Sequence, residues 1–231
     1  MPLTVNELAR MVDLSAVRTD VPIAEVRQLA ALARQYNCVC AFAMPCYTRE
    51  LAAMLADAPQ VRVGGTVGFP SGASTPAVKA AEARQQLADG ADELDMVMNV
   101  GLLLSERYGG VVADIRAVVD AAGATPVKVI LETHYLSDDQ IRRGAELCLR
   151  AGAAFVKTGT GWTPTGATPH NISLIKSVVG EKARIKAAGG IRDLASLVEL
   201  YRCGARRFGL GLASGAKILA EAAALPGGVD I

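Results

Sequence analysis

The sequence lacks any long hydrophobic run. No stretch of about 18 uninterrupted apolar residues occurs, so no membrane span is expected. The opening MPLTVNELARMVDLS has no cationic segment followed by an apolar one, so no signal peptide is expected either. Charge of one sign is not in excess, because 24 Lys and Arg stand against 23 Asp and Glu without a dense basic run. These absences argue against nucleic acid and membranes as partners.

Cysteine and histidine are scarce in the patterns that bind metals. The five cysteines are an odd number without CxxC spacing, and His134 and His170 are the two histidines. A zinc cluster is therefore not expected, and we predict no metal and no other cofactor. Unpaired thiols are typical of a reducing compartment, so the expected location is the cytoplasm.

Aromatic residues make up 4% of the chain, whereas hydrophobic residues make up 51%. The apolar residues are mainly Ala, Val, Leu and Ile, which suits layers of helices and strands better than a β-sandwich. A chain of 231 residues can bury a substantial single core. No Pro-rich or Ser-rich linker divides it and the connections read as short, so residues 1–231 are predicted to form one domain.

Short apolar runs alternate with segments of helical period along the chain. After a short helix near residues 5–10, eight units of a strand followed by a helix can be read. Strands without polar alternation are typical of a parallel sheet covered by helices. Eight units in a chain of this length predict a (β/α)₈ TIM barrel, with an open doubly wound sheet as the alternative. The predicted strands are MVDLS, CVCAFAMP, VRVGGTVGFP, DELDMVMNV, PVKVILET, AAFVKTGT, ARIKAAGG and ARRFGLGL.

Two lysines lie inside strand-like sequence near the carboxyl ends of neighbouring strands. Lys157 ends the apolar part of AAFVKTGT, and Lys186 lies in RIKAAGG. The carboxyl ends of the strands form the active face of a TIM barrel. Asp13 and Asp95 fall at the ends of two other strands, so two lysines and two carboxylates are predicted to meet at one mouth. Lys128 lies near the start of its strand and is predicted to face away from that mouth.

A pair of lysines has a chemical use. A lysine amine must be neutral to attack a carbonyl, and its ordinary pKa of about 10.4 leaves it protonated at neutral pH. A second cation beside it in a desolvated pocket lowers that pKa. The pair therefore favours a Schiff-base enzyme, with nearby carboxylates serving the proton transfers. The alternative is that each lysine merely snorkels or pairs with a buried carboxylate.

Glycine-rich segments follow the last three predicted strands: GTGW, AGGIR and GLGLASG. Backbone N–H groups near helix starts often hold a phosphate at this face of a barrel. Arg192 would add a charge-assisted contact. The alternative for any single segment is a tight turn between strand and helix, but three in succession favour an anion site.

The sequence resembles the deoxyribose-phosphate aldolase family. The resemblance covers nearly the whole chain and is carried by VDLS, TVGFPSG, GADELDMVMN, VKVILET, FVKTGTG and IKAAGGIR. It implies a class I aldolase, a carbon–carbon lyase that reversibly cleaves 2-deoxy-D-ribose 5-phosphate to acetaldehyde and D-glyceraldehyde 3-phosphate. The implied partner is a small aldehyde or sugar phosphate, and the implied assembly is a homo-oligomer.

The resemblance also assigns residues. It implies that Lys157 forms the Schiff base, that Lys186 tunes the pKa of Lys157, and that Asp95 is the carboxylate of the proton relay. Asp13 matches an aspartate that positions the substrate hydroxyl. The implied substrate-binding set is Asp13, Ser15, Thr158, Gly161, Gly189, Gly190, Arg192 and Gly209.

The chain departs from the family pattern at several positions. Phe42 stands where many relatives carry cysteine, and Trp162 stands where Phe or Lys is usual. The family commonly has hydroxyl residues just after Gly209, where this chain has Leu210, Gly211 and Leu212, so two candidate phosphate donors are lost, although a shifted loop could bring Ser214 to the site. We expect phosphate binding to be weakened. The alternative is that Leu210, Leu212 and Trp162 line an apolar pocket for an unphosphorylated or different aldehyde.

Two functions from other classes would use the same residues. A pyridoxal phosphate enzyme also needs a lysine imine and a phosphate loop, and it would be yellow when purified. A sugar-phosphate-binding or isomerase barrel would use the lysines as charges alone, so borohydride would trap no adduct.

Overall fold

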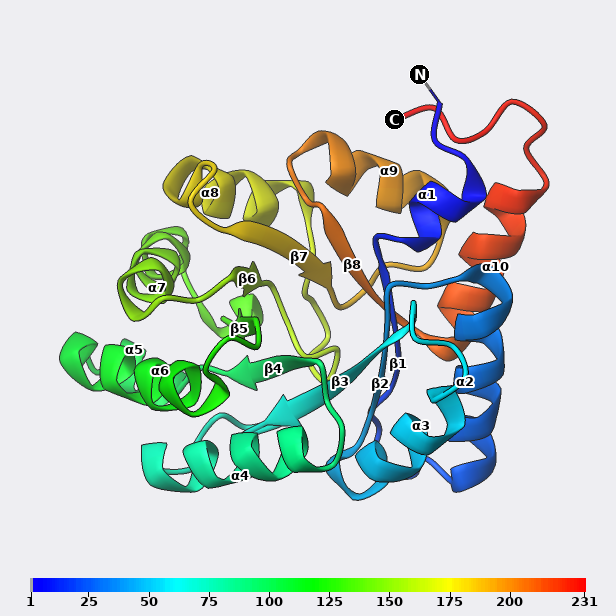
Figure 1. Cartoon of the computed structure of the whole chain (residues 1–231). Coiled ribbons are helices and arrows are strands. Elements are labelled where there is room, and N and C mark those ends of the chain that lie inside the picture. The colour runs from blue at the N-terminus through cyan, green and yellow to red at the C-terminus, as the bar shows by residue number, and fades with distance from the viewer. Residues whose placement is uncertain (1) are drawn as a thin grey trace.

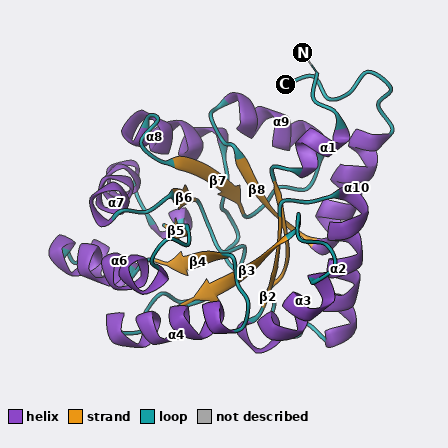
Figure 2. Cartoon of the chain, in the orientation of Figure 1, coloured by secondary structure: helices purple, strands orange, loops and turns teal. Residues whose placement is uncertain are grey.

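Eight parallel strands pair in chain order and close on themselves in the computed structural model, which describes residues 2–231 (Figure 1). Figure 2 shows these strands surrounded by helices, so the predicted TIM barrel is confirmed. The strands are β1 (Val12–Ala16), β2 (Cys40–Ala43), β3 (Arg62–Val67), β4 (Glu93–Val97), β5 (Val127–Ile130), β6 (Phe155–Lys157), β7 (Arg184–Ala188) and β8 (Arg207–Gly211).

The helices follow the strands as the apolar periodicity predicts. They are α1 (Val5–Ala9), α2 (Ile23–Tyr36), α3 (Thr48–Leu55), α4 (Pro76–Ala88), α5 (Val100–Leu104), α6 (Tyr108–Ala122), α7 (Asp138–Ala151), α8 (Pro169–Val179), α9 (Leu194–Arg202) and α10 (Leu212–Ala223). Two short 3₁₀ turns, η1 (Pro45–Tyr47) and η2 (Thr133–Tyr135), follow β2 and β5. Within residues 2–231, no helix is long and apolar enough to cross a membrane.

Helix α5 was missing from the sequence-based prediction. Its sequence VGLLL is apolar without a helical period, so it reads as a continuation of the fourth strand. The side chain of Asn99 accepts a hydrogen bond from the N–H of Leu102 at 3.0 Å and starts the helix instead.

A buried ion pair fixes the carboxyl end of β4. The Lys79 ammonium of α4 lies 2.7 Å from the Asp114 carboxylate of α6 and donates to the carbonyl of Val97 at 2.8 Å. Asp114 also accepts a hydrogen bond from the N–H of Asn99 at 3.2 Å. Both side chains are buried, so this pair ties the outer helices to the backbone just beyond the strand that carries Asp95.

The connection from β6 to α8 is longer than the sequence suggested. It runs over residues 158–168, so the GTGW segment does not lie at a helix start as expected. Glu132, which follows β5 with a left-handed φ of 55°, holds this loop. Its carboxylate accepts from the N–H and hydroxyl of Thr160 and from the hydroxyl of Thr163. Hydrogen bonds to a buried carboxylate therefore hold this loop in position.

Candidate active site

A cavity of about 240 Å³ opens at the carboxyl ends of the strands. Most of the residues singled out from the sequence line it. They are Asp13, Ser15, Asp95, Lys157, Gly161, Lys186, Gly189, Gly190, Arg192 and Gly209. Side chains that the sequence did not single out for the site complete the wall, among them Arg18, Thr66 and Thr160.

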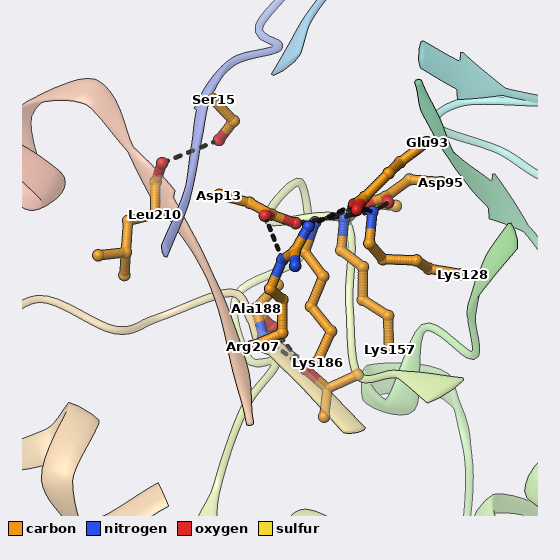
Figure 3. Close-up of polar contacts among 12 residues, drawn as sticks. Asp13, Ser15, Glu93, Asp95, Lys128, Lys157, Lys186, Ala188, Arg207 and Leu210 are labelled. Carbon is orange, nitrogen blue, oxygen red and sulfur yellow. Dashed lines mark hydrogen bonds and ion pairs between the residues drawn. The ribbon is translucent and has the colours of Figure 1, made fainter. Parts of the chain in front are cut away.

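The two strand-end lysines meet at one carboxylate. Lys157 and Lys186 are register partners on β6 and β7. The Oδ2 atom of Asp95 accepts a hydrogen bond from Lys157 Nζ at 2.8 Å and from Lys186 Nζ at 2.7 Å (Figure 3). Lys186 also forms an ion pair with Asp13 at 2.5 Å. A single carboxylate oxygen therefore lies within proton-transfer distance of both ammonium groups.

The two groups at the centre of the site have shifted pKa values. Burial lowers the pKa of Lys157 to about 8, since the attraction of Asp95 is outweighed by desolvation together with the charges of Lys186 and Lys128. For Asp95, burial alone would raise the pKa, but the charges of Lys128, Lys157 and Lys186 hold it well below the ordinary value. The base stays ionised while the amine is poised to lose its proton.

Lys128 corrects the sequence-based prediction. We expected it to face away from the mouth, but its buried ammonium points toward Asp95 and Glu93 (Figure 3). It donates to Asp95 Oδ1 at 3.0 Å and pairs with Glu93 at 2.7 Å. Although its burial is unfavourable for the charge, the carboxylates of Asp95, Asp13 and Glu93 raise its pKa. Lys128 is thus a fixed cation that occupies one oxygen of Asp95 and leaves the other for the lysine pair.

Arg207 and Glu93 were also missed. Arg207 Nε donates to Asp13 Oδ1 at 2.5 Å, and its other end pairs with Glu93. Side chains two residues apart on a strand share a face, so Arg207 lies below Gly209 and Glu93 lies below Asp95. That period-two relationship was the signal in the sequence that could have found both residues.

The interior network has more bases than acids. Its acids are Asp13, Glu93 and Asp95, and its bases are Lys128, Lys157, Lys186 and Arg207. With every group ionised these seven buried groups carry one surplus positive charge, which loss of a proton from one base would remove, and the half-exposed Arg62 adds a further cation beside Glu93. The pKa of Lys157 is lowered chiefly because the amine is desolvated and also because the cations Lys186 and Lys128 lie close to it, so Lys157 is the base poised to become neutral.

Asp13, Cys40 and Glu93 are close enough together to suggest a metal site. Arg207 already pairs with both carboxylates, and burial raises the pKa of the Cys40 thiol well above its ordinary value. A protonated thiol and two carboxylates that already have cationic partners are poor metal ligands. This group belongs to the ion network.

Thr158 does not line the cavity, although the resemblance placed it in the substrate-binding set. Its hydroxyl donates to the carbonyl of Ala188 at 2.7 Å and accepts from the N–H of the same residue at 3.0 Å. Both hydrogen bonds join β6 to β7 next to the lysines. Ser15 does line the cavity, and its hydroxyl donates to the carbonyl of Leu210 at 3.1 Å.

One side of the cavity has the features of an anion site. Gly189 and Gly190 have left-handed φ values of 91° and 87°, conformations that favour glycine. Arg192 lines this side and has no ion-pair partner among residues 2–231. Gly211 caps α10 and Ser214 lies in its first turn, and both line the cavity. Two glycines with left-handed backbone, a serine and an arginine therefore lie together on this side of the cavity, a combination typical of anion sites.

The eighth loop does not form the apolar pocket considered from the sequence. Leu210 is buried outside the cavity, and Leu212 begins α10 without lining it. The reason is the alternation of the strand, since Gly209 and Gly211 take the inward positions and Leu210 points outward. Trp162 does line the cavity, as does Phe42, whose ring centroid lies 4.3 Å from Lys186 Nζ.

A TIM barrel with two coupled lysines and a buried carboxylate at its mouth defines a Schiff-base lyase site. The sequence pattern of the DeoC/LacD family of aldolases matches residues 8–221. The deoxyribose-phosphate aldolase of Klebsiella pneumoniae is 48% identical over 94% of this chain and 88% of its own, and that of Rhizobium meliloti is 42% identical over 98% and 91%. The tetrameric deoxyribose-phosphate aldolase of Aeropyrum pernix superimposes with a TM-score of 0.86 at 30% identity, over 94% of this chain and 92% of its own.

The chain therefore belongs to the DeoC/LacD family of aldolases. It is a carbon–carbon lyase, as the resemblance implied.

Proposed function

We propose that this enzyme is a class I aldolase that reversibly cleaves 2-deoxy-D-ribose 5-phosphate to acetaldehyde and D-glyceraldehyde 3-phosphate. The observation that carries the proposal is the Asp95 oxygen shared by Lys157 and Lys186, together with the pKa of about 8 for Lys157. A neutral amine and an ionised base at one site are what imine chemistry requires.

Each step of the cleavage has a group to carry it. Neutral Lys157 adds to the C1 aldehyde of the open-chain sugar, and loss of water gives a protonated imine. The C3 hydroxyl then loses its proton to Asp95 as the C2–C3 bond breaks. C3 becomes the aldehyde of D-glyceraldehyde 3-phosphate, which leaves, and the bonding electrons move to the imine nitrogen. The resulting enamine takes a proton at C2, with Lys186 and Asp95 as the relay. Water then releases acetaldehyde and regenerates the Lys157 amine.

The remaining cavity residues are proposed to hold the rest of the sugar phosphate. Asp13 and Ser15 lie on the β1 side, where they would contact a substrate hydroxyl. The phosphate would bind Arg192 and the backbone N–H groups of Gly189 and Gly190, with the Ser214 hydroxyl as a further donor.

Covalent trapping tests the proposal. Incubation with acetaldehyde and sodium cyanoborohydride should add an ethyl group to Lys157 and inactivate the enzyme, as mass spectrometry and peptide mapping would show. The control is Lys157→Met, which should give no adduct at that site. An ethyl group found on surface lysines alone would refute the assignment of the nucleophile.

The same experiment separates the other two functions considered from the sequence. Lysines that act as charges alone would give no adduct at position 157 in the parent enzyme. A pyridoxal phosphate enzyme would instead be trapped with the cofactor on its lysine and would absorb near the visible range as purified.

Three further expectations accompany the proposal. Residues 1–231 act as a single catalytic domain. The protein is a homo-oligomer, as the tetrameric relative from Aeropyrum pernix suggests. It works in the cytoplasm, a compartment that suits its five free cysteines, of which Cys46 is exposed.

A further inference from the structure

A second cavity, of about 380 Å³, lies beside the catalytic one. Of the residues that the structure describes, Trp162 alone lines both cavities. The indole therefore forms the wall between the catalytic cavity and its neighbour. The other residues that line the second cavity come from the loops after β3 and β6, from the end of β4, the start of α5 and the β5–α7 connection.

The wall is held from three sides. Trp162 Nε1 donates to the carbonyl of Val17 at 2.8 Å, which spans the mouth from the β6 loop to the β1 loop. The indole meets the ring of Phe69 edge to face, with the ring centroids 6.0 Å apart. Its backbone N–H donates to the hydroxyl of Thr160 at 3.0 Å, and Thr160 is fastened by the buried Glu132. Trp162 is 44% exposed and nevertheless has three partners that orient its side chain and backbone.

The second cavity suits an alkyl chain better than an anion. Pro70, Val97 and Val100 supply apolar walls. Its carboxylate, Glu132, is already bonded to Thr160 and to Thr163, and a negative charge there would repel a phosphate. No lysine or arginine is among the residues described that line it.

We propose that Trp162 is the specificity-determining residue that limits the length of the acceptor aldehyde, and that the second cavity is a latent binding site for an acceptor's alkyl chain. This proposal rests on the proposed aldolase function. In the synthetic direction, the methyl carbon of acetaldehyde, activated as the enamine on Lys157, forms a bond to the carbonyl carbon of the acceptor. The acceptor oxygen takes up a proton. An unphosphorylated acceptor has no group to bind Arg192, so its alkyl chain can lie against Trp162 instead.

The proposal predicts how chain length affects the parent enzyme and Trp162→Ala. Each methylene transferred from water to an apolar site strengthens binding about fourfold. Hexanal has three more methylenes than propanal, and these would enter the second cavity once the indole is removed. Because their burial there is partial, the hexanal-to-propanal ratio of kcat/KM should rise on the order of tenfold, mainly through a lower KM for hexanal.

Three variants serve as controls. Tyr135→Ala enlarges the second cavity but leaves the wall intact, so the ratio should stay at the parent value. Val100→Phe fills the second cavity, so adding it to Trp162→Ala should remove the gain. Trp162→Leu, which keeps an apolar contact with Phe69, provides the same comparison if Trp162→Ala does not fold.

Adduct formation on Lys157 with acetaldehyde is measured in each variant, so that two kinds of failure can be told apart. No adduct in the parent enzyme would refute the proposed function. A normal adduct together with an unchanged hexanal-to-propanal ratio in both Trp162 variants would refute the proposal that Trp162 limits the length of the acceptor. A gain that survives Val100→Phe would overturn the second cavity as the binding site for the chain.

Discussion

Lys157 and Lys186 are register partners on adjacent strands, and one oxygen of Asp95 accepts a hydrogen bond from each of them (Figure 3). The shared oxygen distinguishes this arrangement from two separate ion pairs. Both lysines are buried, so the positive charge of one acts on the other with little screening by solvent.

The first prediction concerns the pH dependence of imine formation. With a pKa of about 8, roughly a tenth of Lys157 is neutral at pH 7, and the neutral fraction rises as pH passes through 8. The rate of trapping with acetaldehyde and cyanoborohydride should rise with the same midpoint and then level off. In Lys186→Leu a cation that lowers the pKa is gone, so the midpoint should move to higher pH, with partial recovery of the rate in alkaline buffer.

The matched control is Lys176→Leu, which removes a partly exposed lysine of α8 that pairs with Glu181. Its trapping profile should coincide with that of the parent enzyme. If Lys186→Leu instead loses the same proportion of its rate at every pH, then Lys186 transfers protons directly and its role in tuning the pKa is wrong.

The second prediction is that Asp95→Asn shifts the same profile in the opposite direction. Asp95 raises the pKa of Lys157, so its neutralisation should move the trapping midpoint to lower pH while the imine still forms. Turnover of 2-deoxyribose 5-phosphate should fall about 10²- to 10⁴-fold, because the relay base is lost. The two readouts would thus change in opposite senses.

Asp114→Asn is the control for the second prediction. It neutralises another buried aspartate that pairs with a lysine, Lys79, but it lies outside the cavity. Urea unfolding should show a loss of stability for both variants, whereas the collapse of turnover should be confined to Asp95→Asn. An unchanged turnover in Asp95→Asn would remove Asp95 from the mechanism.

The sequence was sufficient for the barrel and for the lysine pair. Each strand is a short apolar run and each long helix has its own period, so local pattern determines both. Lys157 and Lys186 stood out because a charged residue is unusual in such a run. That both lysines contact one oxygen of Asp95 depends on the register of three strands. The local sequence pattern does not determine the register between segments that are far apart in the chain.

Lys128 shows where inference from the sequence failed. Its strand VKVI is buried on both faces, so the apolar neighbours do not reveal which face is the barrel interior. Its place near the start of the strand suggested a position away from the mouth. The register pairs Lys128 with Asp95, and three carboxylates stabilise its charge. The direction of the Lys128 side chain therefore depends on how the barrel closes.

The third prediction tests a pair that packs across β2 and β3. A Cβ atom at Gly64 would lie 2.2 Å from the ring of Phe42, its register partner, so no side chain fits there while the ring is present. Gly64→Ala should lower the free energy of unfolding by about 1–3 kcal/mol, because both residues lie in closely packed strands. The measurement is urea unfolding followed by circular dichroism.

A double mutant separates the effect of this clash on stability from any other effect of placing alanine at position 64. Phe42→Ala alone should lower the free energy of unfolding by about 3–5 kcal/mol, because removal of the ring leaves a cavity. Combined with Gly64→Ala, the total should be smaller than the sum, since the methyl group then enters that space. Gly109→Ala, in α6 with nothing near its Cβ position, should instead stabilise by up to about 1 kcal/mol. Additive costs at positions 42 and 64 would contradict the packing.

The last prediction concerns the phosphate. The family's hydroxyl residues just after Gly209 would supply neutral hydrogen bonds, each worth about 1 kcal/mol, and this chain lacks them, whereas a bond from a charged donor is worth about 1.5–3 kcal/mol. Arg192 is therefore expected to carry most of the recognition, with help from the backbone of Gly189 and Gly190. The parent enzyme should cleave 2-deoxyribose 5-phosphate with a higher kcat/KM than 2-deoxyribose.

Arg192→Ala should reduce that ratio of specificity constants by about 10- to 100-fold without bringing it to one, because the backbone donors remain. Lys217→Ala is the matched control. Its ammonium lies 3.4 Å from the backbone carbonyl of Arg192, yet Lys217 does not line the cavity, so the ratio should change little. An equal loss in both variants would mean that general positive charge attracts the substrate. A ratio near one in the parent enzyme would refute the anion site and indicate an unphosphorylated acceptor, for which the wall formed by Trp162 would be the main determinant of specificity.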